Sequence, residues 1–266
     1  MSSISQQVNA ERLVLLGWGR AILLQLAHPL IAAGVHEHSS FRATPLAAAS
    51  RLHETVRAML ALTFGGSADR TQVLETIRTI HQRVHGRLPE RVGPFPAGTP
   101  YSAEDPDLVL WVHLTLLESV PLVYSLFVKP LSPLERDDYC AEAAWVAEEL
   151  GARPAEVPRT AADVQAAIGQ TYASGAIAVG SQARELAAAV LAPRIARLVP
   201  PLAALNRRVT LGLLPEDVRN QYGLRWDERQ QARFEAVVPR LRAFRHRVPD
   251  AIALWPEARR CRRPGK

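Results

Sequence analysis

Residues 105–114 read DPDLVLWVHL and begin the stretch that decides the fold. After Pro106 the run is apolar on every side of a helix, which is typical of a helix buried in a protein core. Asp105 followed by Pro106 is a helix-start signal, because an N-cap side chain accepts a backbone N–H bond and proline is tolerated at the first helical position. The sequence therefore predicts a buried helix over residues 106–128.

The helical pattern continues on both sides of this segment. Ser132 before Pro133, and Thr160 three residues before Asp163, are further helix-start signals. Period-two alternation is short, and no Asn-Gly or Asp-Gly hairpin turn is present. We expect an all-α fold. Besides 106–128, helices are predicted over residues 8–27, 29–37, 45–63, 70–86, 132–150, 160–172, 174–190, 195–212, 215–221 and 227–246.

The chain is predicted to form one domain over residues 1–258. Its apolar fraction of 48% is sufficient for a sizeable core. The loops at 87–105 and 151–159 are short, and apolar helices resume directly after each, so neither is expected to link separate domains. Residues 259–266, RRCRRPGK, are predicted to be a disordered basic tail.

Composition excludes several classes of protein. The 266 residues include 32 Lys and Arg against 26 Asp and Glu, for a net charge of +6, but nearly all the cations are arginine. We take this as a compositional habit and expect no nucleic-acid partner. Two cysteines are too few for a disulfide scaffold or a Cys-only metal cluster. The sequence contains no phosphate-binding glycine loop, G-x-S-x-G, HExxH or CxxC motif, and nothing in it resembles a nucleotide enzyme.

The N-terminal region suggests a location. The first ten residues lack the basic start of a secretory signal, so we expect a cytoplasmic protein. Residues 13–35 are apolar but contain Arg20, Gln25 and His28, which favours a buried helix over a membrane span. A peripheral membrane contact and the oligomeric state stay open.

Histidines are the main candidates for chemistry. In the helix predicted at 70–86, His81 falls about 50° from the centre of the apolar stripe and His85 about 90° away. His81 is therefore predicted to point inward, between Ile77 and Val84. A metal on one ring nitrogen and a hydrogen bond on the other would satisfy a buried imidazole. Alternatively, His81 and His85 bind zinc together with a third ligand.

Two other helices contribute candidates. His113 lies in the buried 106–128 segment, either bonded to backbone or as a ligand. Arg51 and Thr55 lie one turn apart beside the inner face of the 45–63 helix. Arg51 either forms an ion pair at the rim or offers donors to an anionic or oxygen-derived group in a cavity.

Many of these residues resemble the MpaB-type oxygenase family, which also contains rubber oxygenases. The similarity covers about residues 10–245 and rests on many short motifs in the same order. The matching positions include Leu23–Pro29, Gly34–Val35, His38–Arg42, Pro45, Arg51–Leu52, Thr55, Phe64–Gly65, His81, Val84, Gly86, Tyr101, Asp105–Pro106, Trp111–His113, Tyr139, Leu213–Pro215, Arg219 and Tyr222–Leu224.

This resemblance implies an all-helical domain with a globin-like core around one haem b. It implies that His81, from an H-x-x-V-x-G motif, ligates the iron. The remaining candidates for cofactor binding are His28, His85 and His113.

The resemblance also implies catalytic candidates. Arg51 and Thr55 match an R-x-x-x-T motif that lines the distal side of the haem in rubber-cleaving members. Those members carry a lysine directly before the threonine, where this chain has Glu54, and this difference argues against rubber cleavage. Glu54 either points at the iron or faces solvent. Glu37 corresponds to the acidic base proposed for the rubber enzymes.

Three functions are compatible with these features. The first is a haem-b oxygenase that uses dioxygen on an apolar substrate, such as an isoprenoid or another unsaturated lipid-like molecule. The second is a non-catalytic carrier or sensor of haem or an apolar ligand. The third is a zinc or non-haem iron enzyme that uses His81, His85 and either His113 or an acidic residue.

Overall fold

The fold is all-α, as predicted. A computed structural model describes residues 3–39, 45–191 and 200–262. The helices are α1 (Ile4–Asn9), the 3-10 helix η1 (Arg12–Gly17), α2 (Trp18–Leu26), α3 (Pro29–His38), α4 (Pro45–Phe64), α5 (Ser67–His81), α6 (Pro106–Phe127), α7 (Pro133–Glu149), α8 (Ala161–Ala173), α9 (Ser181–Leu191), α10 (Pro200–Leu213), α11 (Glu216–Gln221), α12 (Glu228–Glu235), α13 (Val237–Arg247), α14 (Asp250–Ala253) and α15 (Pro256–Arg262). The strands β1 (His85–Arg87) and β2 (Pro100–Ser102) form a small antiparallel hairpin.

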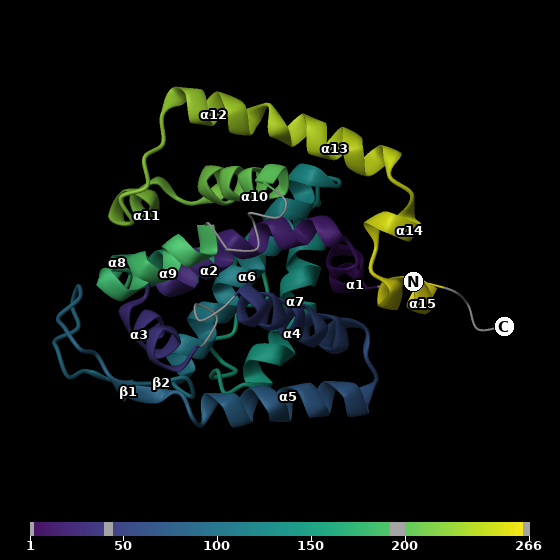
Figure 1. The fold of residues 1–266 in the computed structure, drawn as a ribbon. Coiled ribbons are helices and arrows are strands. Elements are labelled where there is room, and N and C mark those ends of the chain that lie inside the picture. The colour runs from purple at the N-terminus through teal and green to yellow at the C-terminus, as the bar shows by residue number, and fades with distance from the viewer. Residues whose placement is uncertain (1–2, 40–44, 192–199, 263–266) are drawn as a thin grey trace.

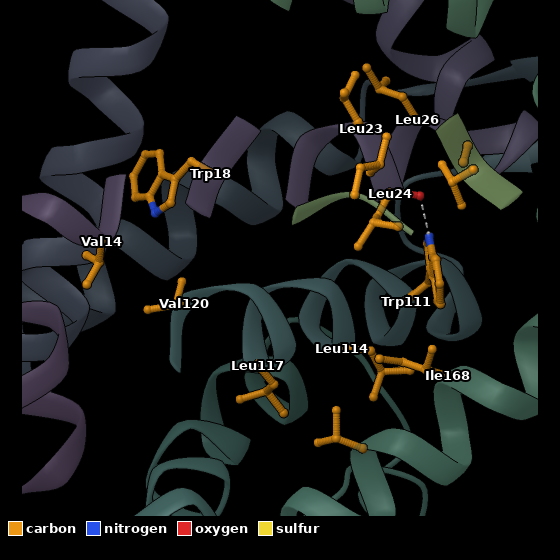
Figure 2. Packing of buried hydrophobic residues seen from close by; sticks show 14 of the residues in the cluster. Val14, Trp18, Leu23, Leu24, Leu26, Trp111, Leu114, Leu117, Val120 and Ile168 are labelled. Carbon is orange, nitrogen blue, oxygen red and sulfur yellow. Dashed lines mark hydrogen bonds between the residues drawn. The ribbon is translucent and has the colours of Figure 1, made fainter. Parts of the chain in front are cut away.

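Helix α6 lies at the centre of the molecule, which confirms the prediction of a buried helix there. It packs on η1 and α2 on one side and on α7, α8 and α13 on others. Figure 2 shows Leu24 of α2 beside Trp111 of α6, while Leu114 and Leu117 of α6 point away from Leu24 in this view. The Trp111 indole N–H donates to the Leu24 carbonyl at 3.1 Å, so the one polar atom of this large side chain is satisfied within the core.

The predicted helix over residues 8–27 is wrong, because three shorter elements replace it. Glu11 is extended, forms a bridge to Leu254 and separates α1 from η1. Gly17 and Gly19 allow η1 and α2 to approach their neighbours closely. A Cβ on Gly17 would lie 2.9 Å from the Ser119 carbonyl oxygen, closer than atoms can pack. Tertiary contacts therefore decide the backbone here.

The predicted helix over residues 70–86 is also wrong at both ends. Helix α5 begins at Ser67 and ends at His81, and the chain then turns into the hairpin, where Gly86 pairs with Tyr101. Val84 and Leu88 are four positions apart, which fits the apolar stripe of a helix. A separation of four also fits a strand, because every second residue of a strand faces the same side. The helical pair His81 and His85 therefore does not exist.

The C-terminal region differs from the prediction as well. Helix α9 begins at Ser181 rather than near residue 174, and a break at Ala236 separates α12 from α13. The basic tail predicted at 259–266 is wrong for residues 259–262, which belong to α15; the rest of that tail lies outside the described residues. Helix α15 is ordered because Ala258 packs against Ala10, and the Trp255 N–H donates to the Ala10 carbonyl.

In the described part of the chain, one helix, and a second segment if a bent pair is taken as one span, meet the length and composition of membrane helices. One is α6, although 67% of its most apolar window is buried inside the protein. The other would join residues 12–26 to α3, but the two parts are bent by 106°. Both observations are typical of core helices in a folded domain.

Candidate functional site

His81 is the last residue of α5 and lines a cleft of about 260 Å³. The cleft lies between the end of α5, the end of α7 and the turn after β2. Figure 1 shows the end of α5 next to the hairpin. Arg78 crosses one wall, where its guanidinium donates to the carboxylate of Glu149 at 2.7 Å. Glu104 lies on the opposite chain segment. The imidazole of His81 is half-buried, so it lies at the margin of the core rather than at its centre.

The apolar face of α5 is covered only in part. Leu74 is the one α5 side chain that is fully buried, at 5% exposed. Ile77 is half-buried, and Ile80 remains 39% exposed. A 15-residue helix with a sustained apolar stripe normally buries that stripe against a partner. This helix therefore presents apolar surface beside His81 that the described part of the protein does not cover.

Helix α4, which packs against α5, carries the predicted R-x-x-x-T motif. Its inner face is anchored by Val56 and Leu60, which are both buried. Thr55 is exposed, and Glu54 is also exposed, where it accepts a hydrogen bond from the Ser50 hydroxyl at 3.1 Å. The side chain of Arg51 lies outside the described residues.

Glu37 lies in a group of polar residues where the end of α3 meets the hairpin. The Tyr101 hydroxyl donates a hydrogen bond to the Glu37 carboxylate, and His38 Nε2 lies 3.1 Å from the carbonyl oxygen of His85. Burial, followed by the bond to Glu37, raises the pKa of Tyr101 above its usual range. Gly86 lies directly against this pair, since a Cβ there would come within 2.5 Å of the Tyr101 hydroxyl oxygen.

His113 is buried at 8% exposed in α6, and its Nε2 has no hydrogen-bond partner among the residues described. Burial lowers the pKa of His113 to about 4, so the ring is neutral at pH 7. His28 is likewise buried, but it lines a different cleft from His81. Neither histidine lines the His81 cleft, and a role for them in binding a cofactor stays a prediction.

The structure thus separates the predicted residues into groups. Glu37 lies beside the hairpin that contains His85, because Tyr101 bonds Glu37 and His38 bonds the His85 carbonyl. His81, four residues before His85, lines a separate cleft. The zinc alternative is not supported, because the helix that would have aligned His81 with His85 ends at His81. Within residues 3–39, 45–191 and 200–262, no group of three or more His, Cys, Asp or Glu side chains is arranged to hold a metal ion.

The family resemblance includes Tyr101 and Gly86, but the sequence analysis assigns neither of them a role in this site. Tyr101 was assigned to an irregular loop, and Gly86 to a helix. The alternation of Val84, Gly86 and Leu88 was the available signal for a strand, and a glycine inside a strand marks a close approach of another group. That group is the Tyr101 side chain.

Comparison with known proteins identifies one family. The family described as "ER-bound oxygenase mpaB/B'/Rubber oxygenase, catalytic domain" matches residues 5–243, which is nearly the whole chain. No curated protein and no solved structure matches significantly.

Proposed function

Because this chain belongs to the mpaB/rubber oxygenase family and is an oxygenase, we propose that it binds haem b through His81 and oxygenates an apolar, unsaturated substrate. The observation that carries the proposal is the position of His81 at the end of an apolar helix face that the described protein leaves partly exposed. An oxygenase must bring dioxygen and substrate to an activating centre, and this imidazole is suitably placed to hold one.

The chemistry of the α5 face fits a haem. Histidine is a common axial ligand of haem iron. A flat macrocycle would bury the exposed parts of Ile77 and Ile80, and burial of apolar surface stabilises a complex by about 25 cal/mol per Å². Arg78 lies at the rim of the His81 cleft and would have to exchange its partner Glu149 for an acidic substituent of the cofactor.

When bound, the haem supplies the iron that activates dioxygen. The contribution of the protein is to position groups around that centre and to exclude water. Thr55 and Arg51 are proposed as hydrogen-bond donors from α4, because a hydroxyl and a guanidinium both stabilise negative charge on oxygen. The apolar side chains of the α4–α5 region would select a hydrocarbon substrate.

Glu37 is proposed as the base of the reaction. Its carboxylate is exposed and can accept a proton from a substrate, while the buried hydroxyl of Tyr101 holds one carboxylate oxygen in place. The proposed role of Glu37 is therefore to remove a proton at the carboxylate oxygen that Tyr101 leaves free.

Dioxygen consumption tests the proposed reaction. The haem-loaded protein should consume dioxygen with squalene but not with squalane, the saturated molecule of the same carbon skeleton. Equal rates with both would contradict an oxygenase that acts on carbon–carbon double bonds. No consumption with any unsaturated hydrocarbon, from a protein that retains haem, would contradict the proposed substrate class.

A further inference from the structure

A second cleft, of about 390 Å³, lies beside the N-terminal half of α6. It shares no lining residue with the His81 cleft. Leu110, Trp111 and Leu114 of α6 form its apolar wall, and Phe95 comes from the loop between the strands. Small-molecule sites usually have volumes of about 300–1,000 Å³ and apolar walls with few polar groups. The cleft falls within this class.

His28 lines the cleft and has one buried ring nitrogen that the fold leaves unpaired. His28 is only 6% exposed and packs its ring 5.3 Å from that of Phe95, yet its Nδ1 has no hydrogen-bond partner among the residues described. His28 is also the N-cap of α3 but makes no capping hydrogen bond. Since Ser, Thr, Asn or Asp stabilises a helix start better, the imidazole is not explained by the needs of α3.

The charges around the cleft restrict the ligand. Both charged side chains in its lining, Asp105 and Asp107, are acidic and disfavour an anion. Both already have partners, because Asp105 accepts the N–H of residue 107 at 2.9 Å and Asp107 is bonded to Arg153. The cleft therefore has no need of a cation, and a neutral ligand fits it best.

The protonation state of His28 determines which polar group of a ligand can form a hydrogen bond with its ring. Burial lowers the pKa of His28 to about 4, against a smaller opposing effect of Asp107, so the ring is neutral at pH 7. A neutral imidazole has one nitrogen that donates and one that accepts. A hydroxyl group can meet either nitrogen, because it both donates and accepts.

We propose that this cleft binds a neutral, mainly apolar alcohol, whose hydroxyl bonds the His28 imidazole while its hydrocarbon chain packs against Phe95 and Trp111. Gln170 and Thr171 of α8, together with Ser174 directly after it, form the polar side of the cleft. This is a binding site in addition to the proposed oxygenase site. It does not depend on haem, so its test has no catalytic readout.

Three ligands of one chain length test the chemistry. Calorimetry on the full chain should detect saturable binding of 1-octanol at pH 7. Octylamine and octanoate, which differ only in the charged head group, should bind at least about tenfold more weakly, since a tenfold change in Kd is about 1.4 kcal/mol. Tighter or equal binding of either charged ligand would overturn the proposal.

Two variants test whether 1-octanol binds beside His28. His28→Phe keeps a flat ring without the polar edge and should weaken 1-octanol binding about tenfold, as expected for the loss of one hydrogen bond. It should not lower Tm, because the free protein no longer buries an unpaired nitrogen. His246→Phe, the same exchange at an exposed position on α13, should change neither quantity. A lower Tm with unchanged affinity would mean that His28 is structural.

Leu110→Trp provides a second route if His28→Phe does not fold. Leu110 lines the cleft and is only partly buried, so a larger side chain there can fill the cleft. This variant should remain folded and lose 1-octanol binding. Unchanged binding in Leu110→Trp would place the alcohol elsewhere and overturn the proposal.

Discussion

The hydroxyl of Tyr101 donates a hydrogen bond to the carboxylate of Glu37 and so joins the hairpin to the end of α3. Tyr101 is 5% exposed, while Glu37 is exposed. Because burial raises the pKa of Tyr101, the phenol stays protonated and continues to donate throughout the physiological range. A rigid, buried group thus fixes one oxygen of an accessible carboxylate.

If Glu37 is the base, this bond should matter for turnover. Glu37→Gln should lower kcat by about 10²-fold, the usual contribution of a general base. Tyr101→Phe should lower kcat less, because the carboxylate remains but is no longer held. The double variant should be no slower than Glu37→Gln alone, since both changes affect one function. Initial rates of the four proteins check this, and additive losses would contradict the coupling.

Gly86 should tolerate no side chain. In Gly86→Ala the new Cβ would lie 2.5 Å from the Tyr101 hydroxyl oxygen, so the hairpin must move, at a cost of about 1–3 kcal/mol in the free energy of unfolding. Gly169→Ala on α8 is the matched control, because a Cβ there meets nothing within 4 Å. Urea unfolding should show destabilisation of the first variant and a gain of up to about 1 kcal/mol in the second. Equal stability of the two variants would refute the close approach.

Substitutions of Thr55 and of its neighbour Glu54 should have different effects on kcat. The Glu54 carboxylate accepts a hydrogen bond from Ser50 and has no part in the proposed reaction, so Glu54→Ala should leave kcat within about twofold. Thr55→Val keeps the shape of the side chain but removes its donor, and should lower kcat by about 10²-fold if the hydroxyl stabilises charge on oxygen. Haem-loaded variants assayed in parallel distinguish the two. A larger loss in Glu54→Ala would show that the carboxylate reaches the reaction centre.

His113 should make stability depend on pH. Its folded-state pKa of about 4 lies below the value of 6.5 for a free histidine. The unfolded chain therefore binds a proton that the folded chain does not, and stability is lost as the pH falls from about 6.5 toward 4, by up to about 3 kcal/mol. Urea unfolding at pH 7 and pH 5 should show this loss, and His113→Leu should reduce it. An identical pH dependence in both proteins would contradict the assigned environment.

The parts of the fold that depend on local signals could be predicted from the sequence. Asp105, Ser132 and Thr160 cap α6, α7 and α8 in the structure, each through a side chain that accepts a backbone N–H. The uniform apolar character of residues 108–114 correctly indicated burial. Each of these signals acts within about one helical turn, so no knowledge of distant segments was needed.

The secondary-structure predictions that were wrong concern segments whose backbone depends on contacts with distant parts of the chain. Gly86 is in a strand because Tyr101, 15 positions later in the chain, packs against it, and Glu11 is extended because it meets Leu254. Periodicity cannot detect either contact. The same limit applies to the site: Glu37 was predicted as a base, but its partner Tyr101 was invisible without the hairpin.

The most direct test of the account is a visible absorption spectrum with iron analysis of the purified protein and of His81→Ala. We predict a Soret band with about one iron per chain in the wild-type protein, a band that is lost or greatly weakened in His81→Ala. The exposed-histidine variant His246→Ala should retain the band. A wild-type protein without a Soret band after haem is supplied, or a His81→Ala variant with an unchanged spectrum and iron content, would contradict the assignment of His81 as the haem ligand.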